Sequence, residues 1–159
     1  MTEPMPNEEL RRTAAQFIDL RAKSRARAWP ILGRDATLAE EAGPAGSLLF
    51  TCRTSPAMAN PLGIVHGGIT AALVDTCMGV TCSAQCGRAA TPTVTMTVNY
   101  ARPVPLDADI RVRVRTVRIG SSTAQMSAEV FLPQRPDELL ASASAVYAIK
   151  RSTPQAGEA

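Results

Sequence analysis

The feature that most constrains this chain is a long stretch with almost no charge. Residues 54–87 span 34 positions and contain one formally charged side chain, Asp75. A membrane-spanning helix would fit the length, but Pro61 and a Gly-Gly pair interrupt the apolar run, and an Asp at the centre of such a helix costs about 2.5 to 3.5 kcal/mol on insertion scales. The stretch therefore predicts a helix buried within protein, over about residues 68–85, that is covered on nearly every side.

The size and composition of the chain favour one globular domain. Its 159 residues lie within the usual range for a single domain. Hydrophobic residues make up 45% and charged residues 19% of the sequence, which argues against disorder and against a coiled coil. A net charge of +3 is too small to indicate a nucleic-acid binder. Because only 4% of the residues are aromatic, small aliphatic side chains must fill the core and bring its elements close together.

Outside the apolar stretch, the hydrophobic pattern predicts one helix and six strands. The expected helix covers residues 7–26, and the expected strands cover 35–41, 47–54, 93–100, 109–119, 123–132 and 139–150. In the strand at 109–119 the apolar positions change from even to odd near Arg115 and Thr116, which predicts a β-bulge there. Residues 133–137 are expected to form a loop.

These elements predict an α+β fold in which one antiparallel sheet wraps around one helix, with an extra helix at the N-terminus. The expected organisation is an N-terminal helix and lead-in at residues 1–33, a single domain at 34–151 and a disordered tail at 152–159.

The cysteines and the single histidine do not suggest a metal centre. Cys52, Cys77, Cys82 and Cys86 include no C-x-x-C pair, and His66 is the only histidine. The first residues lack the apolar segment of an export signal. We therefore expect reduced thiols in a cytoplasmic protein that uses no metal and binds no membrane.

Asp75 is the most informative residue of the apolar stretch. A carboxylate among Ala, Leu, Val and Met side chains loses several kcal/mol of hydration, on the order given for buried charges, unless a polar group meets it. One interpretation is a structural Asp that pairs with a backbone amide or with an Arg at a subunit contact. The other is a general base or a nucleophile.

Three further features are candidates for a binding site. His66, Gly67 and Gly68 precede the buried helix, where free backbone N–H groups bind anions, although the same residues also suit an ordinary turn with a structural His. Asn60 precedes a proline, so its amide has a fixed direction or simply serves a turn. Thr93 opens the first strand after the helix, where its hydroxyl faces either the helix or water.

The combination Asn60-Pro-Leu-Gly63-Ile-Val-His66-Gly67-Gly68-Ile-Thr-Ala-Ala-Leu73-Val-Asp75 resembles the hotdog-fold acyl-CoA thioesterases of the phenylacetic acid degradation type. Their pattern is an Asn, then Gly-x-x-His-Gly-Gly, then Leu-x-Asp on the central helix. The order and lengths of the strands from about residue 35 to 150 resemble that fold as well. The resemblance implies a hotdog thioesterase domain at 34–151 and hydrolysis of an aryl- or medium-chain acyl-CoA. It also implies no cofactor and a homodimer that pairs into a dimer of dimers.

The resemblance also implies a role for each site residue. Asp75 matches the catalytic carboxylate, as nucleophile or as general base on water. Gly67 matches the glycine whose backbone N–H polarises the thioester carbonyl. Asn60 matches an amide that positions the thioester or the water and faces the carboxylate of the other subunit. His66 matches an orienting histidine, and Thr93 falls where a hydroxyl often orients the water.

For the CoA moiety we expect Gly68 at the helix entrance and, as partners of the phosphates, Arg88 and Arg118, with Arg102 as a further candidate. Two alternatives stay open. A hotdog dehydratase or hydratase would use His66 as its base, although a carboxylate nine residues after the His fits the thioesterase pattern better. The other is a non-catalytic acyl-CoA sensor, a hotdog domain attached to a DNA-binding segment. The residues before the first strand are too few to form a helix-turn-helix of that kind.

Overall fold

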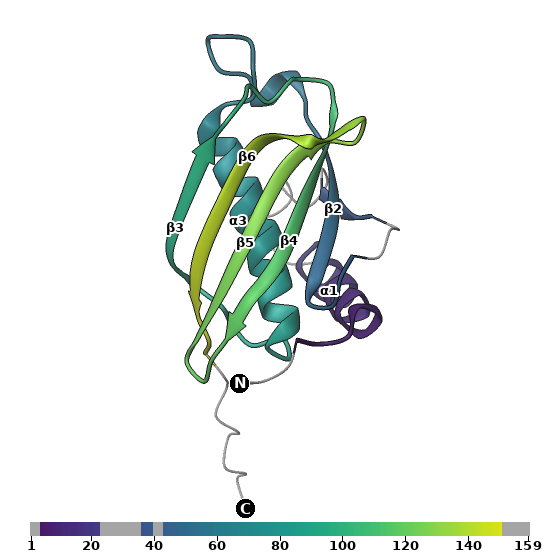
Figure 1. The fold of residues 1–159 in the computed structure, drawn as a ribbon, viewed down its shortest axis with the longest axis vertical. Helices are drawn as coiled ribbons and strands as arrows, with labels where there is room; N and C mark the ends of the chain where they lie inside the picture. The colour runs from purple at the N-terminus through teal and green to yellow at the C-terminus, as the bar shows by residue number, and fades with distance from the viewer. Residues whose placement is uncertain (1–3, 23–35, 40–42, 151–159) are drawn as a thin grey trace, which may run out of the picture.

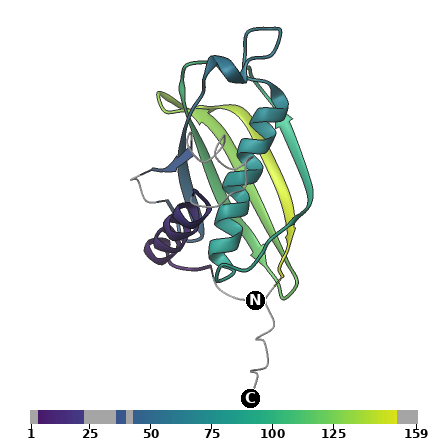
Figure 2. The same ribbon diagram turned by 180° about the vertical axis from the view of Figure 1, so that it is seen from behind.

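The computed structural model describes residues 4–22, 36–39 and 43–150. One six-stranded antiparallel sheet curves around the long helix α3 (Gly67–Gln85), with the strands in the order β1-β2-β4-β5-β6-β3. Helix α1 (Asn7–Ala22) lies beside α3 at the β2 side, and β3 lies on the opposite side of α3 (Figures 1 and 2). A 3₁₀ turn, η1 (Pro56–Met58), precedes α3. The strands are β1 (Ala36–Leu38), β2 (Ser47–Arg53), β3 (Thr93–Tyr100), β4 (Asp109–Ile119), β5 (Thr123–Leu132) and β6 (Arg135–Ala148).

The α+β architecture predicted from the sequence is confirmed, including the extra N-terminal helix. The predicted bulge is also present, at the register shift between Thr116 and Arg118 of β4. The loop expected at 133–137 is wrong in extent, because Arg135 already pairs with Leu132 and the strands are joined by a tight turn. Positions 23–33 of the expected lead-in and the tail at 152–159 lie outside the described residues.

Small side chains let the sheet and α3 pack closely. Ala141, Ala143 and Ala145 of β6 are buried on the face toward the helix, as expected from their alternation with Ser142 and Ser144. On the other side of α3, helix α1 buries its apolar stripe against the core and leaves its acidic residues exposed. The low aromatic content is therefore a consequence of how near the sheet the central helix lies.

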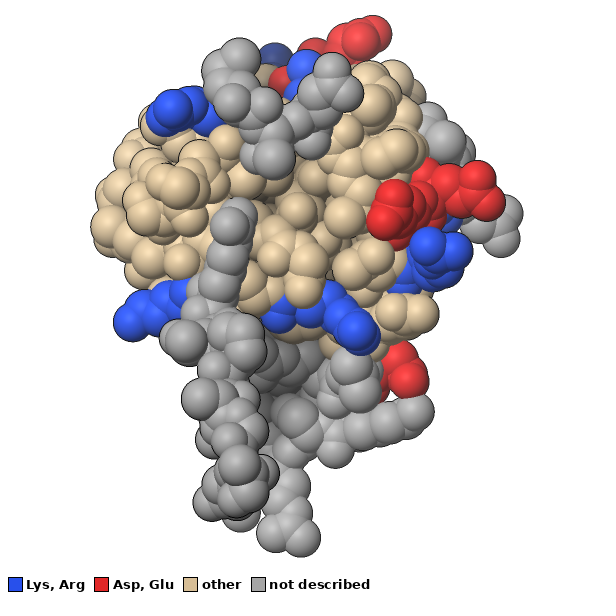
Figure 3. Space-filling view, turned by 90° about the horizontal axis from the view of Figure 1, so that it is seen from below, with Lys and Arg blue, Asp and Glu red and all other residues tan. Residues whose placement is uncertain are grey.

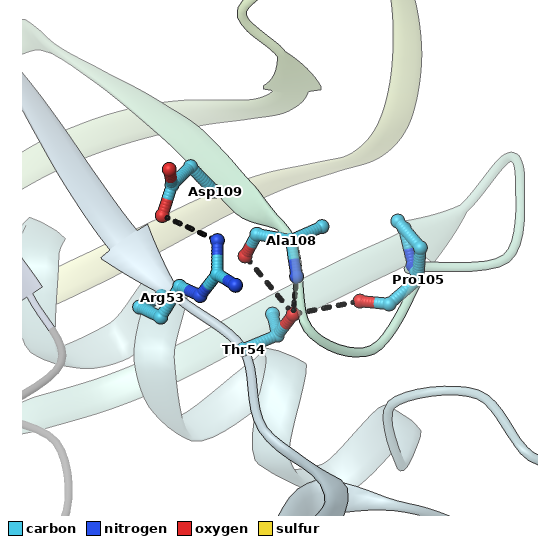
Figure 4. A network of polar contacts seen from close by, with 5 residues as sticks. All are labelled: Arg53, Thr54, Pro105, Ala108 and Asp109. Carbon is cyan, nitrogen blue, oxygen red and sulfur yellow. Dashed lines mark hydrogen bonds and ion pairs between the residues drawn. The ribbon is translucent and has the colours of Figure 1, made fainter.

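A polar junction fixes the point where β2 ends and β4 begins. The hydroxyl of Thr54, which is buried, lies 2.8 Å from the carbonyl oxygen of Pro105 and 3.0 Å from that of Ala108, and it accepts a hydrogen bond from the N–H of Ala108 (Figure 4). Beside it, Arg53 and Asp109 form an exposed ion pair at 3.3 Å. The buried hydroxyl thus supplies a partner for the carbonyl oxygen of Pro105 and for the N–H of Ala108.

One flank of the molecule is open in the single chain. Among the described strands, β3 pairs only with β6, so its other edge is free there, and Val94 and Tyr100 on it are 63% and 54% exposed. The neighbouring flank of α3 is also uncovered, since Gly68 and Ala72 are exposed. The expected cover on nearly every side of α3 is therefore incomplete in one chain, because no element in the described part of the chain reaches past β3. Seen from the end where α3 finishes, uncharged side chains fill much of the surface (Figure 3).

Candidate active site

Asp75 lies at the centre of a small polar cluster. Thr93, the first residue of β3, donates a hydrogen bond from its hydroxyl to Asp75 Oδ1 at 2.9 Å. The hydroxyl of Tyr147, near the end of β6, also lies 2.9 Å from Oδ1 and 3.1 Å from the main-chain carbonyl oxygen of Asp75. The half-buried carboxylate thus has the polar partners that its apolar surroundings demand. Among the residues that the structure describes, the side-chain partners of Asp75 are these two hydroxyls and not an amide or an arginine.

The two hydroxyls hold one oxygen of the carboxylate and leave the other available. Both bind Oδ1, and no hydrogen bond joins Oδ2 to any residue that the structure describes. The side chain of Tyr147 is 1% exposed, and its burial, followed by the charge of Asp75 and the hydrogen bond to it, raises the pKa of the phenol well above its usual value. Tyr147 therefore stays protonated and acts as a donor, which fixes the orientation of Asp75.

Beside this cluster is a cavity of about 500 Å³. Asp75, Thr93 and Tyr147 line one part of it. The rest of the wall comes from α3, from the segment at 89–92, from Lys150 and from Phe17 of α1. A carboxylate with a free oxygen at the edge of a largely apolar cavity is suited to act on a bound uncharged group.

A second group of predicted residues lies at the start of α3. His66 caps the helix, and its Nδ1 accepts a hydrogen bond from the N–H of Gly68 at 2.9 Å. Nδ1 therefore carries no proton in this arrangement. The N–H of Gly67 donates to no residue within the described part of the chain, while its carbonyl oxygen accepts a hydrogen bond of 2.8 Å from Tyr100. The helix terminus thus presents a backbone donor that is available to a ligand.

Asn60 occupies a turn in the loop before α3. Its Oδ1 accepts hydrogen bonds from the N–H groups of Leu62 at 2.9 Å and Ile64 at 3.4 Å. Gly63 in the same loop has φ of 74°, a conformation that favours glycine. The turn fixes the direction of the Asn60 side chain, and its amide nitrogen binds none of the described residues.

The structure brings the predicted residues together as two groups and not as one. Thr93 and Asp75 form the first group, and His66, Gly67 and Gly68 form the second. Gly67 and Asp75 are eight positions apart on one helix, which corresponds to about 12 Å along its axis. A single carbonyl group cannot contact both.

The three arginines expected to bind CoA are exposed and line no part of the cavity; they are Arg88, Arg102 and Arg118. The guanidinium of Arg102 donates a hydrogen bond to the carbonyl oxygen of Leu139.

A comparison with protein families gives the class of enzyme. The model of the thioesterase superfamily matches residues 62–139, a range that includes the start of α3, Asp75 and Thr93. The protein is a thioesterase. The match confirms the resemblance drawn from the sequence and the predicted class of enzyme, a thioester hydrolase. No curated protein gives a significant match to the sequence.

Solved structures show the same fold as this thioesterase. The E. coli PaaI protein from the phenylacetic acid degradation operon is 20% identical, with a TM-score of 0.74 over 91% of this chain and 98% of that one. A phenylacetic acid degradation-related protein from Ralstonia eutropha JMP134 is 24% identical, with a TM-score of 0.70 over 86% and 99%. The protein smu.793 from Streptococcus mutans UA159, bound to acetyl CoA, is 19% identical, with a TM-score of 0.64 over 74% and 92%. The hotdog fold is thereby confirmed.

Cysteine chemistry and metal chemistry find little support in the described part of this thioesterase. All four cysteines are free thiols. A hydrogen bond with Cys52 and then burial raise the pKa of Cys77, and a hydrogen bond with Cys86 and then burial raise that of Cys82. Thiols of this kind are poor nucleophiles. The described residues contain no group of three His, Cys, Asp or Glu side chains that could hold a metal ion. None of the described helices is both long and apolar enough to cross a membrane.

Sequence reasoning missed Tyr147 and Tyr100 as members of these two groups. A signal for Tyr147 was present, because it continues the inward-facing series of Ala141, Ala143 and Ala145 on the last strand. A lone tyrosine in that series must lie under the helix and needs a partner for its hydroxyl. Tyr100 gave no such signal, since it ends an exposed strand and its contact with Gly67 depends on the curvature of the sheet.

Proposed function

We propose that this thioesterase hydrolyses the thioester bond of an aryl- or medium-chain acyl-CoA and requires no cofactor. The observation that carries the proposal is the half-buried Asp75, held through one oxygen by two hydroxyls, at the edge of an apolar cavity. The acetyl CoA bound to the Streptococcus mutans protein supports a CoA thioester as the substrate. The four free thiols fit a reducing compartment, and we propose the cytoplasm.

In the proposed reaction Asp75 acts as a general base through Oδ2. The carboxylate takes a proton from water, the water oxygen forms a bond to the thioester carbon, and the carbon–sulfur bond then breaks. The proton passes to the leaving thiolate, so the products are a carboxylic acid and free CoA thiol. A positioned base contributes about 10² to 10⁴ in rate. Direct attack by Asp75, with hydrolysis of the resulting anhydride, gives the same products.

The oxyanion donor in this proposal comes from a second copy of the chain. Negative charge develops on the carbonyl oxygen, and one preorganised N–H donor is worth about 10² to 10³ in rate. The free N–H of Gly67 is such a donor, but about 12 Å of helix separates it from Asp75 of the same chain. A homodimer that pairs the free β3 edges would cover the open flank of α3 and set Gly67 and Asn60 of one subunit opposite Asp75 of the other.

The remaining predicted residues have supporting roles in the proposal. His66 fixes the helix terminus by capping it and orients the Gly67 donor. Thr93 holds Asp75 and is near enough to the cavity to orient the attacking water. Gly68 and the exposed Arg88 and Arg118 are proposed to meet the CoA moiety, in a homodimer that pairs further into a dimer of dimers.

The role of Asp75 is tested by the release of free CoA thiol from a panel of aryl- and alkyl-CoA thioesters. Asp75→Asn retains the oxygen that accepts from Thr93 and Tyr147, so it preserves the fold while it removes the base. We expect the variant to lose at least 10³ in kcat. Turnover by the variant within tenfold of wild type would exclude Asp75 as the base.

The same panel separates the alternatives. If the wild-type protein releases thiol from no thioester but is stabilised by acyl-CoA in thermal unfolding, it is a sensor. A dehydratase would instead require His66 as the base, and its Nδ1 already accepts from Gly68. A loss of 10³ or more in His66→Gln would favour that reaction.

A further inference from the structure

We propose that the cavity beside Asp75 receives the acyl group of the substrate, and that Phe17 and Gly79 set the length and width of the group it accepts. The inference rests on the proposed function, because it takes Asp75 as the point where the thioester carbon lies. It goes further by assigning specificity to two residues that the family pattern does not include.

The position of the cavity along α3 gives it a reacting end and a far end. Asp75, Thr76, Gly79, Val80 and Ser83 line it, and they follow one another along a single face of the helix. From Asp75 to Ser83 this face extends for about 12 Å. Thr93 and Tyr147 stand at the Asp75 end, so an acyl chain whose carbonyl lies there would extend toward the C-terminal end of α3.

The chemistry of the wall favours an uncharged, apolar group. Carbon-rich side chains come from Phe17, Val80, Ala89, Ala90 and Pro92. The one buried hydroxyl at the far end, on Ser83, already donates to the carbonyl oxygen of Ala89 at 2.9 Å. Thr76, Thr91 and Lys150 add polar side chains to the wall. An acyl chain needs no hydrogen-bond partner and gains from contact with the carbon-rich side chains, whereas the pantetheine arm of CoA carries two amides that each need one. The acyl group is therefore the part of the substrate that this cavity suits.

Phe17 lines the cavity from outside the sheet. It lies on α1, is half-buried and packs against the core, whereas every other lining residue belongs to α3 or to the chain after it. Replacing its ring by a methyl group would extend the cavity without changing a residue of the strands or of α3. In this proposal the length of the acceptable acyl group is set by α1, which lies outside the sheet.

Gly79 leaves space where a side chain would stand. A Cβ added there would lie 3.8 Å from Cε1 of Tyr147, which is ordinary van der Waals contact, so a side chain can be introduced without displacing the backbone. Because Gly79 lines the cavity one helical turn beyond Asp75, a larger side chain would occupy the path of the acyl chain just past the carbonyl.

The test is kcat/KM for acetyl-, butanoyl-, hexanoyl-, octanoyl-, decanoyl-, benzoyl- and phenylacetyl-CoA in wild type, Phe17→Ala and Gly79→Leu. We expect Phe17→Ala to move the preference toward longer chains, with the ratio of decanoyl to hexanoyl rising at least tenfold. Gly79→Leu should keep acetyl-CoA within about threefold of wild type and lose at least tenfold on octanoyl- and phenylacetyl-CoA. Ile18→Ala is the matched control, because Ile18 is also partly buried on α1 but lines no part of the cavity.

Changes in kcat/KM that are equal for all acyl groups, or that Ile18→Ala reproduces, would overturn the inference and indicate a pantetheine channel or a structural role.

The binding of substrate analogues distinguishes this result from failure of the proposed function. If wild type hydrolyses nothing, calorimetry with S-ethyl-CoA and S-octyl-CoA thioethers still reports on the cavity. Tighter binding of the octyl compound that disappears in Gly79→Leu supports an acyl site, and equal binding of the two by wild type contradicts it. Thermal unfolding verifies that each variant is folded.

Discussion

The middle and the beginning of helix α3 differ in how complete they are within one chain. In the middle, Asp75 has two hydroxyl partners from β3 and β6 and borders a cavity. At the beginning, the cap is complete, but the Gly67 N–H donor points to no described partner. The two groups carry complementary chemistry, a base and an anion site, and about 12 Å of helix keeps them apart.

This difference indicates that each chain holds two half-sites. A base can be positioned by the neighbours it packs against, so the sheet under the middle of α3 is sufficient for Asp75. An oxyanion donor must contact the substrate, so it lies at the surface of the chain, where a ligand or a second chain can reach it. The uncovered flank of α3 and the free edge of β3 lie on the side where a second chain would supply the missing half.

The largest expected effect is complementation between two inactive variants. Asp75→Ala lacks the base and Gly67→Pro lacks the N–H donor, so each alone should retain under about 1% of wild-type activity. If each site takes the base from one subunit and the donor from the other, a mixed dimer contains one intact site. Co-expression at equal levels should then restore about a quarter of wild-type activity, since half of the dimers are mixed.

Co-expression of Asp75→Ala with the double variant that carries both substitutions is the control, because no intact site can form in that pair. Activity of the complementing pair that stays at the level of this control would show that both groups act within one chain, and would remove the dimer from the proposed mechanism. Size-exclusion chromatography verifies that the mixed species assemble.

The next effect isolates the donor at the beginning of α3. Proline is well tolerated at the first position of a helix, so Gly67→Pro removes the N–H with little cost to α3. Gly67→Ala keeps the N–H and places a Cβ in the same position, 3.3 Å from Cζ of Tyr100. We expect Gly67→Pro to lose about 10² to 10³ in kcat and Gly67→Ala to lose less than tenfold. Equal losses in steady-state kinetics would attribute the effect to the contact with Tyr100.

A smaller effect is expected at the middle of α3, where Tyr147 positions Asp75. Tyr147→Phe removes one hydrogen bond to Oδ1 and leaves the bond from Thr93 in place. Because the carboxylate can then turn, kcat should fall about tenfold while KM stays within twofold, a pattern of lost transition-state stabilisation. Thr93→Val is the matched variant and should behave alike. A rise in KM with kcat unchanged would assign Tyr147 to binding instead.

Most of the fold could be predicted because hydrophobic period and turn residues are local signals. The alternation in residues 93–100 and 109–119 predicted the strands, and the change of phase near Arg115 predicted the bulge of β4. The early start of β6 was missed because Pro136 and the charged residues around it are typical of a loop. The tight turn at 133–134 instead brings Arg135 opposite Leu132, so β6 begins directly after the turn.

The candidate site could be predicted in its members but not in its grouping. A lone carboxylate in an apolar helix and a Gly-Gly entrance are visible in the sequence, and Asp75 and Gly67 follow from them. Their separation by two helical turns also follows from the sequence, because both lie in the predicted helix or at its start. The partners of Asp75 could not be predicted, because the approach of Thr93 and Tyr147 depends on how two strands curve around α3.

The smallest expected effect on activity is at His66, and it distinguishes a cap from a base. Its Nδ1 accepts from the N–H of Gly68, so His66→Ala leaves a helix N-terminus without a side-chain cap. Loss of a cap costs about 1 kcal/mol of stability, and Asn in place of His restores a side-chain acceptor at little cost. We therefore expect His66→Ala to lower the free energy of unfolding by about 1 kcal/mol in urea denaturation, with hydrolysis within tenfold of wild type, and His66→Asn to recover most of the stability. If His66→Asn were stable but inactive, His66 would act on the substrate itself, and the beginning of α3 would carry a proton-transfer group in addition to an anion site.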